Sequence, residues 1–168
     1  GVGAPFFYPL FSAMLRAHVN IGSNLGESLA MVERAAGAIE RDLKVEVKRS
    51  APVTSEPWGY ESASAYVNMG ICFDTRLDGA TLLRRLLDIE RSISPASHRN
   101  ADGSYADRLI DIDLIALGDT VVSTPSLILP HPRMHLRPFV LIPMRELDPT
   151  WRHPLTGLTP GEMLSRLI

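Results

Sequence analysis

The chain has 168 residues, a length typical of one domain and sufficient to bury a core without disulfides or a structural metal. Hydrophobic residues make up 45% and charged residues 21%, which argues against disorder. The chain contains no run of about 18 apolar residues, so no membrane span is predicted. The formal net charge is −2, so the chain as a whole lacks the excess of basic residues that is typical of nucleic-acid-binding proteins. The single cysteine, Cys72, has no partner for an internal disulfide, and we expect a cytoplasmic protein.

The first thirteen residues differ in composition from the rest of the chain. Residues 1–13 are uncharged and rich in aromatic side chains, whereas a signal peptide begins with basic residues. No internal repeat or low-complexity linker interrupts the remainder. We therefore expect an N-terminal extension outside the core at 1–13 and a single domain at 14–168.

Strand and helix patterns alternate along this domain. Ala17, Val19 and Ile21 alternate with polar residues, which predicts a half-buried strand. Apolar residues spaced by three and four predict a helix over 25–43. The elements expected after it are a short strand with Val45 and Val47, a loop over 51–65, a strand over 66–74, a helix over 79–93, a polar loop over 94–105, a strand over 109–117, and helices over 136–147 and 160–168.

The order of these elements predicts the fold. Strand, helix, strand, strand, helix, strand is the split β-α-β arrangement. The sequence thus predicts an α+β protein, a ferredoxin-like α-β-α sandwich with a mostly antiparallel central sheet. Two helices would cover one face of the sheet, which leaves the other face to the C-terminal helices.

The sharpest chemical signal lies in the strand predicted at 109–117. Because side chains alternate along a strand, Asp111 and Asp113 point to the same face, roughly 7 Å apart. Burying two like charges is costly, and Mg²⁺ offsets this cost because it prefers carboxylate and phosphate oxygens. Apolar neighbours on both faces favour a central strand over an edge strand with solvated carboxylates. Arg108 either contacts a bound phosphate or pairs with Asp107.

Two other segments allow two interpretations each. In the turn from Gly22 to Gly26, Ser23 or Asn24 caps the following helix, or the glycines let the backbone approach a ligand. Tyr66 and Asn68 share one face of their strand. Together they either stack and hydrogen-bond a flat heterocycle or pack inside a sandwich core.

A fourth segment gathers basic and titratable side chains near the start of a predicted helix, where anions are attracted. Pro132 and Pro138 disfavour the helical spacing that two zinc-binding histidines would need. Phosphate contacts are therefore favoured over zinc. The side chains are those of His131, Arg133, His135 and Arg137.

Taken together, these segments resemble one family, the 6-hydroxymethyl-7,8-dihydropterin pyrophosphokinases. Gly-Ser-Asn-Leu-Gly, Pro-x-Gly before Tyr-x-Asn, Arg-x-x-Asp-x-Asp, and Pro-His followed by Arg-x-Phe occur in the family's order and spacing, from about Arg16 to the C-terminus. The resemblance implies the ferredoxin-like sandwich. It also implies transfer of the diphosphate of ATP to the hydroxymethyl group of the pterin, with release of AMP, in folate biosynthesis.

The resemblance implies roles for individual residues as well. Asp111 and Asp113 would hold two Mg²⁺ ions against the phosphates of ATP and would be catalytic together with Arg99 and Arg108. The residues expected to bind ATP are Glu90, Arg99, Tyr105, Arg108, His131 and Arg137. The residues expected to bind the pterin are Tyr66 and Phe139, which would sandwich its ring, and Ser55, Asn68 and Trp58, which would lie along its edge.

The sequence departs from the family pattern in the loop after Glu90. The family's Gly-Arg-x-Arg segment is absent in that register, so that Arg99 is the best candidate for a mobile phosphate contact. Asp107 stands before Arg108, where the family commonly has proline. The polar loop, with Gly103 as a hinge, suits a lid that closes over ATP.

Two further functions stay open on the residues alone. One is an ordinary kinase that acts on a related heterocycle and releases ADP. The other is a ferredoxin-like RNA-binding or small-molecule-sensing module without catalysis. An RNA-binding sheet displays aromatic residues with basic neighbours, whereas this face carries Asp111 and Asp113. We expect a monomer with small-molecule substrates and with neither a nucleic-acid nor a membrane partner.

Overall fold

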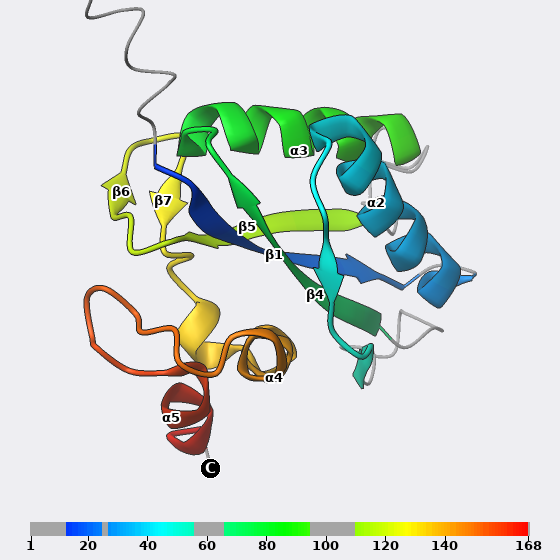
Figure 1. Ribbon diagram of the computed structural model, residues 1–168. Helices are drawn as coiled ribbons and strands as arrows, with labels where there is room; N and C mark the ends of the chain where they lie inside the picture. The colour runs from blue at the N-terminus through cyan, green and yellow to red at the C-terminus, as the bar shows by residue number, and fades with distance from the viewer. Residues whose placement is uncertain (1–12, 25–26, 56–65, 95–109, 168) are drawn as a thin grey trace, which may run out of the picture.

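A computed structural model of the protein describes residues 13–24, 27–55, 66–94 and 110–167. Helices lie on both sides of a central sheet (Figure 1). Within the described part of the chain, no helix has both the length and the apolar character needed to cross a membrane.

The sheet is built around β1 (Leu15–Ser23). This strand pairs antiparallel with β4 (Tyr66–Thr75) on one side and with β5 (Asp111–Leu117) on the other. β2 (Lys48–Arg49) and β3 (Val53–Ser55) pair antiparallel with β4. The resulting order, β2-β4-β1-β5, is that of the split β-α-β arrangement. The predicted ferredoxin-like α+β fold with an antiparallel sheet is confirmed.

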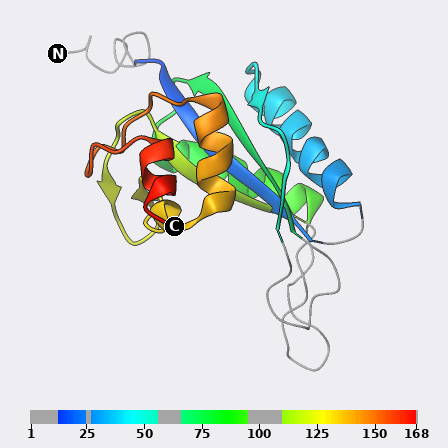
Figure 2. The ribbon, with the colours of Figure 1, turned by 90° about the horizontal axis from the view of Figure 1, so that it is seen from below.

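The two faces of the sheet are covered by different helices. α2 (Ser28–Leu43) and α3 (Gly79–Ile93) pack on one face, where they bury the larger apolar cluster. α4 (Pro138–Leu147) contacts β4 on the opposite face, and α5 (Pro160–Ser165) lies beside α4 (Figure 2). Alternating side chains of the same strands therefore face two separate cores.

β1 is buried on both faces, so the prediction of a half-buried strand is wrong. His18 and Asn20 point away from α2 and α3, yet only 2% and 5% of their surfaces are exposed. The ring of Trp151 lies 6.0 Å from that of His18, centroid to centroid. The second helix layer thus covers side chains that the alternation assigned to a polar face.

Three predicted boundaries also change. Val45 and Val47 precede β2 instead of forming a strand, although Val47 is buried against the core. The predicted loop at 51–65 contains β3, whose Val-Thr-Ser sequence suits a strand although prolines flank it. The helix expected from 136 is divided into a 3-10 turn (Met134–Leu136) and α4, because Pro138 lacks the N–H needed to continue a helix but fits its first position.

β5 ends the sheet among the described strands, so its prediction as a central strand is wrong. Other elements bind its outer edge. The Ile112 N–H donates to Glu90 Oε2 at 2.8 Å, and the Ile115 carbonyl accepts from the His131 N–H at 2.8 Å. His131 follows the small hairpin of β6 (Val122–Ser123) and β7 (Ile128–Leu129). Helix α3 and this segment thus satisfy backbone groups of the edge strand, while the two cores on either side of the sheet bury its apolar side chains.

Candidate active site

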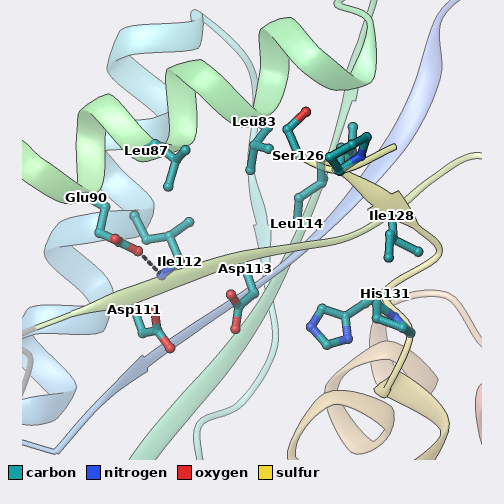
Figure 3. A pocket seen from close by; sticks show the side chains of 13 residues that line it. Leu83, Leu87, Glu90, Asp111, Ile112, Asp113, Leu114, Ser126, Ile128 and His131 are labelled. Carbon is teal, nitrogen blue, oxygen red and sulfur yellow. Dashed lines mark hydrogen bonds between the residues drawn. The ribbon is translucent and has the colours of Figure 1, made fainter. Parts of the chain in front are cut away.

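Two cavities meet at the aspartate pair of β5. The larger cavity, about 620 Å³, lies against the sheet face that carries α4. The smaller, about 360 Å³, lies around the edge of β5, between α3 and the segment after β7. Asp111 and Asp113 are half-buried and line both cavities. Their carboxylates project to the same side of β5, and the His131 ring approaches from the neighbouring segment (Figure 3).

The pairing of β5 with β1 explains where the carboxylates lie. Asp111 is opposite Gly22 and Asp113 is opposite Asn20. Because residues two apart share a face, both aspartates lie on the side away from α2 and α3. The neighbouring Ile112 and Leu114 belong to the apolar core on the other side.

The larger cavity brings together four of the residues predicted to bind the pterin. Ser55 comes from β3, Tyr66 and Asn68 from β4, and Phe139 from the start of α4. Arg137, predicted to bind ATP, also lines this cavity, and its guanidinium carbon lies 5.6 Å from the centroid of the Phe139 ring. This distance is within the range of a cation–π contact.

Sequence reasoning missed four residues of this cavity. Asn20 was assigned to a polar strand face, and Arg133 was grouped with the basic segment without a role in the pocket. Arg133 could have been found from its place between His131 and Arg137, whereas nothing along the chain links Asn20 to a predicted site residue. The four are Asn20, Gly22, Arg133 and Leu136.

Gly22 makes room for the Asn68 amide. A Cβ atom at this position would lie 2.8 Å from Asn68 Oδ1, closer than side chains tolerate. The N-cap of α2 is Glu27, so neither Ser23 nor Asn24 is the N-cap residue of this helix. The glycine therefore serves the cavity, and the capping interpretation of this turn is wrong.

The smaller cavity contains Glu90 and His131, both predicted to contact ATP. The Arg133 N–H donates to His131 Nδ1 at 3.1 Å, so that the proton of the neutral ring resides on Nε2. Burial, followed by the charges of Arg137 and Arg133, lowers the pKa of His131. The ring is therefore a neutral hydrogen-bond donor near pH 7.

Four predicted site residues lie outside the described part of the chain: Trp58, Arg99, Tyr105 and Arg108. The proposed lid with Gly103 and residues 1–12 of the expected extension also lie outside it. No cluster of three or more His, Cys, Asp or Glu side chains suited to a metal occurs in the described residues. The aspartate pair nevertheless fits Mg²⁺, since this ion is commonly held by one or two carboxylates together with substrate phosphates.

Comparison with known proteins identifies the family. Residues 18–149 match the model of the 7,8-dihydro-6-hydroxymethylpterin-pyrophosphokinase family. The chain belongs to this family. Its activity is therefore the ATP-dependent pyrophosphokinase reaction of folate biosynthesis that its motifs predicted.

Curated members of the pyrophosphokinase family match over most of their length. The 2-amino-4-hydroxy-6-hydroxymethyldihydropteridine pyrophosphokinase of Methylorubrum extorquens is 35% identical, with 92% of this chain and 94% of that protein covered. The enzyme of the same name from Aquifex aeolicus is 29% identical, with 84% and 86% covered.

A solved structure shows the same fold at low sequence identity. The wild-type HPPK-DHPS protein of Plasmodium falciparum, crystallised with pteroate, aligns with a TM-score of 0.70 at 12% identity. The alignment covers 92% of this chain but only 42% of the Plasmodium chain, so this chain spans less than half of that protein.

Proposed function

We propose that diphosphate passes from ATP to the pterin at the Asp111–Asp113 pair. The observation that carries this proposal is that both carboxylates line both cavities. The larger cavity would hold the pterin and the smaller one the nucleotide, with the reacting groups meeting between them. The volume of each cavity falls within the usual range for small-molecule sites, roughly 300–1,000 Å³.

In the larger cavity, Tyr66 and Phe139 enclose the pterin ring. The Asn68 amide, for which Gly22 leaves room, hydrogen-bonds the edge of the ring together with Ser55. The site thus combines two aromatic faces with a few polar groups, as flat polar heterocycles require. The backbone near Trp58 is proposed to contribute to the same edge.

In the smaller cavity, His131 donates from Nε2 to a phosphate oxygen, and Glu90 lies beside the nucleotide. The apolar side chains of Leu83, Leu87 and Ile128 form a wall suited to the base. Arg137, at the start of α4, faces the phosphates from the pterin side. Arg99, Tyr105 and Arg108 are proposed as further ATP contacts, with Arg99 and Arg108 taking part in catalysis.

The reaction needs positioning and charge neutralisation more than a nucleophilic side chain. The hydroxymethyl oxygen of the pterin attacks the β-phosphorus, the bond from that phosphorus to the α,β-bridging oxygen breaks, and AMP leaves as the hydroxyl proton is lost. Asp111 and Asp113 are proposed to hold two Mg²⁺ ions. When bound, these ions supply neutralisation of the triphosphate charge and orientation of the attacking oxygen.

The remaining proposals concern the domain organisation, oligomeric state, location and partners of the protein. Residues 14–168 would act as a single domain and residues 1–13 as an extension outside the core. One sheet shared by both helix layers supports this division. The enzyme is proposed to be a cytoplasmic monomer that binds its two small substrates and neither nucleic acid nor membrane.

Analysis of the nucleotide product tests the proposed site. The protein is incubated with ATP, Mg²⁺ and 6-hydroxymethyl-7,8-dihydropterin, and AMP is separated from ADP. AMP that depends on the pterin and disappears in Asp113→Asn supports the proposal. ADP in place of AMP would indicate an ordinary kinase, and an unchanged rate in Asp113→Asn would remove the aspartate pair from the mechanism.

A further inference from the structure

Helix α4 contains a proline that leaves one of its carbonyl groups without a helical partner. In an α-helix, the carbonyl of each residue accepts from the N–H four positions later. The residue four positions after Phe139 is Pro143, which lies inside α4 and has no N–H. The Phe139 carbonyl therefore lacks the N–H donor that the next turn of an α-helix would supply.

A side chain from the central strand supplies the missing donor. Asn20 Nδ2 donates to the Phe139 carbonyl oxygen at 3.0 Å, across 119 positions of sequence. Only 5% of the Asn20 surface is exposed, and the residue lies opposite Asp113 in the sheet. A buried donor thus meets an acceptor that would otherwise be unsatisfied, an arrangement that is costly to disrupt.

The same proline packs α4 against the sheet. The side chain of Pro143 lies against Gly70 of β4 so closely that a Cβ atom at position 70 would collide with Pro143 Cβ. Pro143 therefore has two consequences: it packs tightly against Gly70, and it frees the Phe139 carbonyl for Asn20. The contact with Gly70 holds the middle of α4 against β4, and the hydrogen bond from Asn20 holds its first turn against β1.

We infer that Asn20 is a positioning residue for pterin binding, and this inference rests on the function proposed above for the larger cavity. Its hydrogen bond holds the backbone of the same residue whose ring lines that cavity. Loss of the bond frees the start of α4 and displaces the Phe139 ring from the space opposite Tyr66. The nucleotide cavity contains neither Asn20 nor Phe139. Binding of ATP should therefore change less than binding of the pterin.

A double-mutant cycle between Asn20→Ala and Pro143→Ala tests the inference. The Pro143→Ala change restores an N–H four positions after Phe139 and keeps the Cβ atom that faces Gly70. In that background the helix itself can satisfy the Phe139 carbonyl. Thr75→Ala is the matched control, since Thr75 is similarly buried, at 6% exposed, and accepts from a backbone N–H, that of Leu77, at the far end of β4.

We expect Asn20→Ala alone to raise the KM for 6-hydroxymethyl-7,8-dihydropterin about tenfold and the KM for ATP less than about twofold. In the Pro143→Ala background the same change should raise the pterin KM less than about threefold. Thr75→Ala should lower stability without a selective change in pterin KM. If Asn20→Ala alone does not fold, recovery of a folded protein in the double variant supports the inference, and a double variant that also fails to fold counts against it.

Equal increases in both KM values, or an identical pterin effect in both backgrounds, would overturn the inference. Urea unfolding of the four proteins of the cycle measures the coupling of the two residues without any turnover. Additive losses of stability would also count against the proposed hydrogen bond. Absence of pterin-dependent AMP from the unaltered enzyme would instead refute the proposed function, so that the two failures are distinguishable.

Discussion

The carboxylate of Glu90 accepts the Ile112 N–H at 2.8 Å, which ties helix α3 to the strand between the two aspartates. This contact saturates an N–H on the outer edge of β5, where no described strand is paired. Glu90 thus has a structural role in addition to its place in the smaller cavity. The position of the aspartate pair depends on it, because Ile112 lies directly between Asp111 and Asp113.

The structural role of Glu90 is separable from its charge. Glu90→Gln keeps an acceptor oxygen for Ile112, whereas Glu90→Ala removes it. We expect Glu90→Ala to lower the free energy of unfolding by about 1–3 kcal/mol and Glu90→Gln by less than about 1 kcal/mol. Urea denaturation measures both. Equal losses in the two variants would show that the charge, and not the hydrogen bond, stabilises this edge.

Removal of either aspartate should abolish catalysis without unfolding the protein. Asp111→Ala and Asp113→Ala each remove a proposed Mg²⁺ ligand, and we expect kcat to fall by more than about a hundredfold. Thermal stability should stay constant or rise, because two like charges close together on one strand face repel each other. AMP production and thermal unfolding check the two parts. Unfolding of both variants would make the pair structural instead.

The aromatic residues of the larger cavity should act on the pterin alone. Tyr66→Ala and Phe139→Ala each remove a stacking surface, which we expect to raise the pterin KM at least tenfold. The KM for ATP should change much less. Leu155→Ala, at an apolar side chain that is 69% exposed, is the control expected to change neither. Parallel changes in both KM values would argue against the proposed enclosure of the ring.

A methyl group at Gly22 should disturb pterin recognition. Gly22→Ala places a Cβ atom 2.8 Å from Asn68 Oδ1, so the amide must move. We expect the pterin KM to rise about three- to tenfold, since one hydrogen bond to the ring edge weakens. Gly37→Ala, inside α2 and facing only the flexible end of Arg41, is the matched control. It should leave the pterin KM unchanged, and a similar rise there would contradict the argument.

Buried His18 should make stability depend on pH. Desolvation, with a smaller effect of the Arg16 charge, lowers the pKa of His18 to about 4 from its ordinary 6.5. Neither ring nitrogen has a hydrogen-bond partner among the described residues, and Nε2 lies 3.0 Å from Asp148 Oδ2 without the alignment of a donor.

The direction of the change in stability with pH follows from proton binding at His18. Between pH 6.5 and 4 the unfolded chain binds a proton at His18 that the folded protein does not, so stability falls as the pH falls through this range. The full effect approaches roughly 3 kcal/mol at pH 4 and vanishes above pH 7. Urea denaturation at pH 7 and pH 5 measures it. His18→Phe should flatten the slope, and an undiminished slope in that variant would assign it to other groups.

The sequence predicted the elements whose patterns are periodic. The apolar stripe of α3, at Leu82, Leu86, Ile89 and Ile93, is buried as its spacing requires. The strand order followed from the order of elements, since few arrangements bury two helices on one antiparallel sheet. The hydrophobic pattern gave a wrong prediction where a second helix layer covers a strand face with polar residues, as over His18 and Asn20. It also missed a short strand that lies among prolines, β3.

By itself, the sequence determined the family, the fold class and the pairing of Asp111 with Asp113 on one strand face, because alternation and motif spacing are local properties of the chain. Only the tertiary structure decided that β5 is an edge strand held by Glu90, and that two cavities meet at its aspartates. It also decided that Asn20 satisfies the carbonyl freed by Pro143. These features join residues far apart in sequence, and no periodicity along the chain encodes such contacts.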